Sequence, residues 1–89
     1  MPILSMFYGI IVRMYNEDGG KHKSPHLHAQ YQECKIVVNI DTLEIIEGDF
    51  PKRQYHQLLA WMSIHQDELR ANWMLLSGGD AAFKIEPLK

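Results

Sequence analysis

The sequence predicts an α+β fold, in which a small antiparallel β-sheet of about four strands packs on one long C-terminal α-helix. Short runs of β-branched and aromatic residues, separated by turn-forming residues, fill the first half of the chain and indicate a β-meander. From residue 52 to residue 77, apolar residues recur at the spacing that is typical of an amphipathic helix. A chain of 89 residues without repeats is expected to form a single domain over residues 1–89.

The first half is expected to contain a loop after its first strand and short turns between the later ones. Asp-Gly and Gly-Gly pairs between residues 16 and 25 favour a loop, because glycine adopts positive φ angles at little cost. Pro25 favours an extended conformation in the residue before it, so we expect the second strand to begin at His26. The expected strands cover residues 7–15, 26–31, 35–40 and 43–48.

The long helix is expected to begin directly after the segment Asp49-Phe50-Pro51. Asp49 or a neighbour can cap a helix, and proline is tolerated in the first turn. From Lys52 to Ser77 the helix would be roughly 39 Å long at a rise of 1.5 Å per residue, so one end could overhang the sheet. Gly78 and Gly79 end the helix, and the apolar tail at residues 82–88 either packs back or adds a short strand.

Composition and charge argue against several classes of partner and location. The formal net charge is -2, so nucleic-acid binding is possible but not favoured. One cysteine, Cys34, cannot form an internal disulfide. The chain also has no leader peptide and no apolar run approaching ~18 residues. We therefore expect a cytoplasmic protein that does not enter a membrane.

The pair His26 and His28 is the most informative feature for function. Side chains two residues apart on a strand project from the same face of the sheet. Imidazole binds divalent metals and titrates near neutrality, so the pair is suited either to metal binding or to acid–base chemistry at a phosphodiester. The other possibility is that both rings make hydrogen bonds that orient the sheet and the helix. No metal and no cofactor is assigned, because the local spacing matches neither HExxH nor paired CxxC.

Four further residues are candidates for a site. His65 lies in the apolar stripe of the helix, where it is either a hydrogen-bonded core histidine or a third imidazole that meets the strand pair. Lys23 and Arg53 could hold a phosphate. Trp61 is ~120° from the core line of the helix, so it either packs at the shoulder of the core or anchors a protein partner.

The chain resembles a known family over nearly its whole length, the bacterial domain of unknown function family 4160. The resemblance rests on the order of these motifs: Phe7-Tyr8-Gly9-Ile10, Met14-Tyr15, Pro25-His26-Leu27-His28-Ala29 with Tyr31, Glu47-Gly48, Pro51-x-Arg53, Leu58 to Trp61, His65-Gln66-Asp67-Glu68-Leu69 with Asn72-Trp73, and Lys84-Ile85-Glu86-Pro87-Leu88. It implies no biochemical activity. It does imply a gene context. Members resemble proteins whose genes lie beside the gene for another small domain of unknown function, and such gene pairs have been suggested as toxin–antitoxin-like modules.

For function, we expect a protein-binding component of such a two-gene module. Binding would use the sheet edges, Trp61 and the overhanging end of the helix, since no complete catalytic constellation is visible in the sequence. A protein partner or a homo-oligomer is the expected state.

The alternative is a metal-independent, ribonuclease-like toxin, and the sequence leaves open whether the protein is an enzyme. In that hypothesis His26 or His28 acts as the base and its neighbour or His65 acts as the acid. Lys23 or Arg53 then steadies the phosphate. A small metal-binding domain is the third hypothesis.

Overall fold

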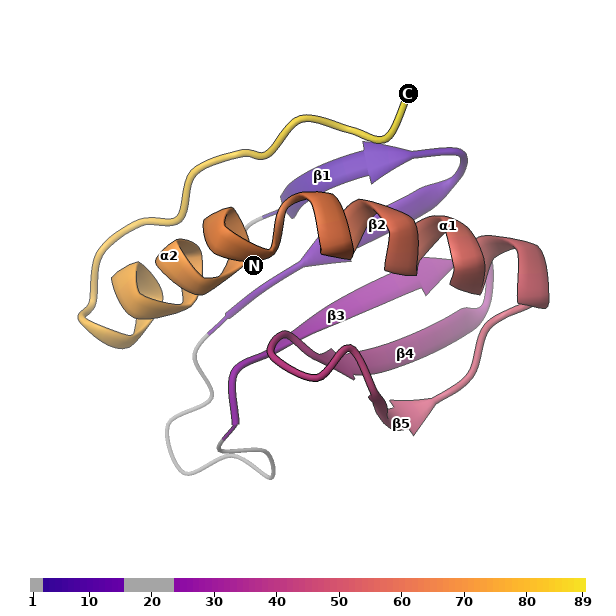
Figure 1. Ribbon diagram of the computed structural model, residues 1–89, viewed down its shortest axis with the longest axis horizontal. Helices are drawn as coiled ribbons and strands as arrows, with labels where there is room; N and C mark the ends of the chain where they lie inside the picture. Colours follow the sequence, from indigo (N-terminus) through magenta and orange to yellow (C-terminus); the bar gives the residue numbers. More distant parts are fainter. Residues whose placement is uncertain (1–2, 16–23) are drawn as a thin grey trace.

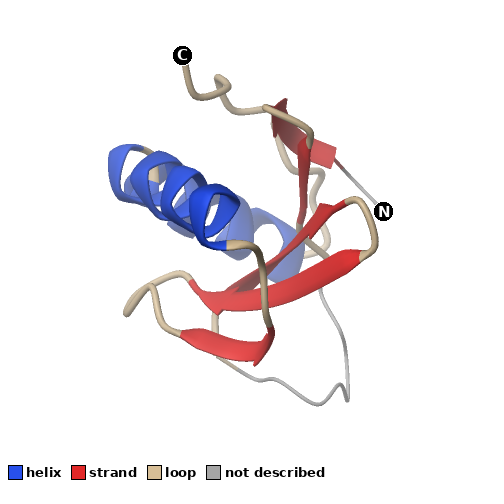
Figure 2. Ribbon diagram, turned by 90° about the vertical axis from the view of Figure 1, so that its right-hand side faces the viewer, coloured by secondary structure: helices blue, strands red, loops and turns tan. Residues whose placement is uncertain are grey.

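The computed structural model describes residues 3–15 and 24–89 as five β-strands and two α-helices (Figure 1). The strands follow one another across a single antiparallel sheet in the order of the sequence, and both helices cover the same face of it (Figure 2). The α+β class is therefore confirmed. The elements are β1 (Ile3–Phe7), β2 (Ile10–Arg13), β3 (His26–Tyr31), β4 (Cys34–Asn39), β5 (Ile45–Gly48), α1 (Lys52–Ile64) and α2 (Gln66–Ser77).

The expected single strand at residues 7–15 is wrong: β1 and β2 form a hairpin that turns within this range, so the sheet has one strand more than predicted. Tyr8 and Gly9 have φ angles of 49° and 81°, so the chain turns there, and Phe7 pairs with Ile10 across the two strands. A side chain at Gly9 would lie 3.1 Å from the ring of Tyr31, which explains why glycine occupies the second turn position. The sequence did not predict this turn, because the apolar residues continue on both sides of it and tyrosine rarely adopts a positive φ.

The predicted single helix is two helices, separated at His65. This residue leaves helical geometry, with φ -108° and ψ 22°, although its N–H still donates to the Trp61 carbonyl at 3.0 Å. Asp67 and Glu68 lie in the first turn of α2, where the helix dipole favours acidic side chains. None of the helices in the described part of the chain is long and apolar enough to cross a membrane.

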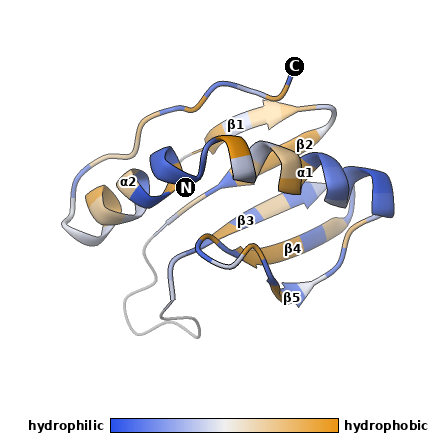
Figure 3. Cartoon of the chain, viewed as in Figure 1, coloured by the Kyte–Doolittle hydropathy of each residue, from blue (hydrophilic) through white to orange (hydrophobic). Residues whose placement is uncertain are grey.

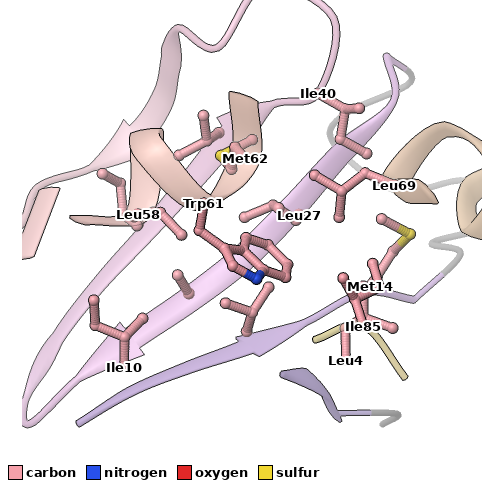
Figure 4. Close-up of a cluster of buried hydrophobic side chains, with 14 of the residues drawn as sticks. Leu4, Ile10, Met14, Leu27, Ile40, Leu58, Trp61, Met62, Leu69 and Ile85 are labelled. Atoms are coloured by element: carbon pink, nitrogen blue, oxygen red, sulfur yellow. The ribbon is translucent and has the colours of Figure 1, made fainter. Parts of the chain in front are cut away.

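Alternate residues of the central strands build the core between the sheet and the helices. The hydropathy colours alternate along β3 (Figure 3), as expected for a sheet with one covered face, whereas β4 carries three successive apolar residues at 36–38. Trp61 is fully buried in the middle of this core, 5.2 Å from the ring of Phe7, and Leu58, Met62 and Leu69 surround it from the helices (Figure 4). The other face of the sheet therefore carries the residues between the core positions.

The C-terminal tail packs back along β1 and forms no further strand in residues 80–89. Ile85 is buried, and its N–H donates to the Leu4 carbonyl at 2.8 Å. The Trp61 indole N–H donates to the Glu86 carbonyl at 2.7 Å, and the buried Asn72 exchanges two hydrogen bonds of 2.9 Å with the backbone of Phe83. These bonds fix the tail to both layers of the fold.

Candidate functional site

A groove of about 430 Å³ lies on the face of the sheet that the helices leave uncovered. Arg13, His28, Gln30, Lys35 and Val37 alternate with core residues along β2, β3 and β4, which places them on the opposite face from the core, and the core residues Ala29 and Ile36 complete the lining between them. The floor is Val37, which is only 7% exposed. The polar side chains that line the groove are Arg13, Tyr15, His28, Gln30, Lys35 and Glu47.

Strand register brings four of the lining residues into one row. Arg13 pairs with His28 across β2 and β3, His28 pairs with Val37 across β3 and β4, and Val37 pairs with Glu47 across β4 and β5. Directly opposed residues of an antiparallel pair project from the same face. His28 and Glu47 therefore flank the Val37 floor, with strands about 4.8 Å apart.

His28 is half-buried and is held by two aromatic contacts. The Tyr15 ring stacks on it at a centroid distance of 4.5 Å and an interplanar angle of 18°. The Tyr15 hydroxyl lies 3.5 Å from His28 Nδ1, the long limit of a hydrogen bond. Because the edge of the His26 ring lies 5.2 Å away on another side, the orientation of the His28 imidazole is strongly restricted.

His26 is a neighbour of His28 but has a different environment. It is fully buried, and its Nδ1–H donates to the Ser24 carbonyl at 2.7 Å. The Trp73 ring of α2 lies 5.1 Å from it. This imidazole therefore links the start of β3 to α2, as in the structural alternative, and the groove lining does not include it.

The structure does not bring the other predicted site residues to the groove. His65 lies at the helix junction, 2.6 Å from the Glu68 carboxylate and 5.5 Å from Trp61 by ring centroids, on the helical side of the sheet. Arg53 is exposed in the first turn of α1, also on the helical side. Lys23 lies outside the described residues.

Trp61 requires a correction. The sequence predicts that it lies on the shoulder of the helix, where it either packs against the core or anchors a protein partner. It is instead completely buried and hydrogen-bonded to the tail, so it presents no surface to another protein. The reason is the tail, whose Glu86 carbonyl and neighbouring Ile85 cover the side of α1 that the sheet leaves open.

The groove combines two cationic groups with an imidazole, a carboxylate and an apolar floor. Arg13 Nη1 donates to Gln30 Oε1 at 3.3 Å, and Gln30 pairs with Lys35 across β3 and β4. Such a set can bind an anionic group beside an apolar one. Within residues 3–15 and 24–89, no group of three or more His, Cys, Asp or Glu side chains is placed to hold a metal ion.

Sequence reasoning identified His28 and missed the other five polar residues that line the groove, which are Arg13, Tyr15, Gln30, Lys35 and Glu47. The signal was present in the register: once β2 is recognised as a separate strand beside β3, Arg13 falls opposite His28. Residues 7–15 were treated as one strand, which left their pairing partners undefined.

A family model described as Domain of unknown function (DUF4160) matches residues 9–74. The match extends from the turn between β1 and β2 into α2, so it includes every strand that lines the groove. No curated protein and no solved structure matches the chain.

Proposed function

Because this chain belongs to the DUF4160 family of unknown function, we propose that it is the protein-binding component of a cytoplasmic two-gene, toxin–antitoxin-like module. The gene context implied by the family resemblance supports a second protein as the partner. We further propose that the partner adds an extended segment to the outer edge of β5. Main-chain hydrogen bonds along a strand edge are a common way to recognise peptides.

The observation that carries this proposal is the exposed, partly apolar edge at β5. Among the described strands β5 is the last in the sheet and pairs only with β4, and all four of its residues are exposed. Ile45 is 42% exposed and Ile46 is 37% exposed. The β4–β5 register shifts between Val37 and Val38, so the two isoleucines lie at an irregular stretch of β5 and form a small apolar patch at the edge.

The opposite edge of the sheet is less suited to a partner. The tail runs beside β1 (Figure 1), and the Ile85 N–H already donates to the Leu4 carbonyl of that strand. Natural proteins often cover one sheet edge with a loop in this way, which prevents unwanted pairing. This contrast favours β5 as the docking edge.

Co-purification with the product of the neighbouring gene tests the proposal. The double variant Ile45→Lys, Ile46→Lys places two charges at the edge, where charged side chains oppose strand addition. Both side chains are more than one-third exposed, so we expect the free protein to stay folded with a loss of roughly 1–2 kcal/mol in the free energy of unfolding, while recovery of the partner falls at least about tenfold.

The matched control is Ile64→Lys, because Ile64 is 66% exposed at the end of α1 and lies away from the β5 edge. This variant should recover as much partner as the original chain. Full recovery by the β5 double variant would rule out the edge as the binding surface. A dimer of the free chain that the same double variant dissociates would show that a second copy, and not another protein, occupies it.

A further inference from the structure

The groove on the open face of the sheet has a chemistry that partner binding at the β5 edge does not use. We propose that it binds a nucleoside monophosphate unit, either as a free nucleotide or as one unit of a single-stranded RNA. The groove is of suitable size, since pockets for small ligands are usually about 300–1,000 Å³ and this one is about 430 Å³.

The phosphate is assigned to the cluster of Arg13, Gln30 and Lys35. Arg13 bonds to Gln30, and Gln30 lies opposite Lys35, so the three residues line the groove from three adjacent strands. The guanidinium carries five N–H groups in a planar fork, and a single bond to Gln30 holds that fork in place. Arginine and lysine together form charge-assisted hydrogen bonds with phosphate oxygens.

The base is assigned to the apolar floor and the aromatic wall. Val37 is buried in the floor, and beside it the ring of His28 from β3 stacks on the ring of Tyr15, which lies two residues after β2. Flat aromatic and imidazole rings are the surfaces on which unpaired bases stack. Because Tyr15 and His28 already restrict each other, the wall is formed before a ligand arrives.

Glu47 is the residue that makes the groove favour a nucleoside monophosphate over an inorganic anion. This carboxylate lies on the far side of Val37 from His28, where it can accept hydrogen bonds from ribose hydroxyls or from base N–H groups. A ligand with one anionic end and one donor-rich end therefore fits better than inorganic phosphate.

A nuclear magnetic resonance titration of the full chain, labelled with ¹⁵N, tests this assignment. The probes are the four 5′-nucleoside monophosphates, a short single-stranded oligouridine and inorganic phosphate, each added up to about 5 mM, which reports dissociation constants in the millimolar range or tighter. We expect saturable shifts at the amides of Arg13, His28, Gln30, Lys35 and Glu47. Shifts with the free nucleotides identify a nucleotide ligand, and shifts with the oligonucleotide alone identify RNA.

Substitutions of the two cationic residues then test where the phosphate group binds. Lys35→Gln removes an exposed charge without touching the core, and it should weaken binding about tenfold, as should Arg13→Gln. The control Arg53→Gln removes an exposed arginine on the helical side and should leave the affinity unchanged. The proposal is overturned if neither nucleotides nor RNA cause saturable shifts, if inorganic phosphate binds as well as they do, or if Lys35→Gln and Arg53→Gln have equal effects.

Discussion

Two buried polar side chains, His26 and Asn72, connect parts of the chain that are distant in sequence. His26 holds the Ser24 carbonyl and contacts Trp73, whereas Asn72 pairs with both the N–H and the carbonyl of Phe83. Neither residue lines the groove. Buried polar groups of this kind are costly to remove, because their partners are left without hydrogen bonds.

For the histidine pair we predict unequal effects on stability. His26→Ala removes a fully buried ring and leaves a carbonyl without its donor, which should lower the free energy of unfolding by about 2–4 kcal/mol. His28→Ala removes a half-buried ring at the groove and should cost about 1 kcal/mol. Urea denaturation of both variants measures the difference, and an equal or larger loss for His28→Ala would contradict the structural role of His26.

For Asn72 we predict that the side-chain amide, and not the size of the residue, stabilises the tail. Asn72→Ala removes both hydrogen bonds to Phe83 and should lower the free energy of unfolding by about 2–3 kcal/mol. Ser77→Ala, an exposed position at the end of the same helix, is the control and should change it by less than about 0.5 kcal/mol. Similar thermal transitions for the two variants would show that the contact contributes little.

At the scale of elements, the β4–β5 pair depends on a close backbone approach at Gly48. Its φ is 81°, and a side-chain carbon built there would lie 2.1 Å from the Lys35 carbonyl oxygen. Gly79 has a similar φ of 85° after α2, but nothing lies within 4 Å of the same position. Alanine in place of Gly79 would therefore cost only the free energy of the positive φ. Alanine in place of Gly48 would cost that free energy and, in addition, a steric clash with the main chain.

We predict that Gly48→Ala displaces β5 while Gly79→Ala leaves the fold intact. Gly79→Ala should cost only the conformational penalty of about 1 kcal/mol. Gly48→Ala adds a clash with main chain, so amide hydrogen exchange should show loss of protection at Ile45 to Gly48. Unchanged protection of β5 in Gly48→Ala would mean that the strand can shift to accept the side chain.

Local signals in the sequence predict some elements well and others poorly, for physical reasons. Pro25 fixes the start of β3, and the expected bounds of residues 26–31 agree with the structure. The turn at Tyr8 and the helix break at His65 were not predicted, because the apolar pattern continues on both sides of each. His28 could be found from its spacing with His26, whereas the groove around it required the strand register.

At the scale of the molecule, the tail closes the fold on one side and leaves the other side open. It covers the β1 edge, buries Trp61, and both accepts a hydrogen bond from Asn72 and donates one to it. The β5 edge and the groove lie on surfaces that the tail does not cover. The side of the sheet that the tail covers therefore contributes to stability, and the β5 edge and the groove are the proposed binding surfaces.

We predict that removing residues 82–89 exposes the core around Trp61. The variant should show tryptophan emission shifted to longer wavelength and a lower melting temperature, because the indole loses both its hydrogen bond and its cover of Ile85. Deleting Lys89 alone removes only an exposed ion pair with Glu86 and serves as the control. Unchanged emission in the truncated chain would show that the sheet and α1 bury Trp61 without the tail.

Amide hydrogen exchange of the chain with and without the product of the neighbouring gene tests the central claim most directly. Strand addition would give new protection to the outward-facing amides of Ile45 to Gly48, while the β1 amides, which lie beside the tail, would exchange as before. New protection confined to β1, to α2 or to the groove, with β5 unchanged, would contradict binding at the β5 edge.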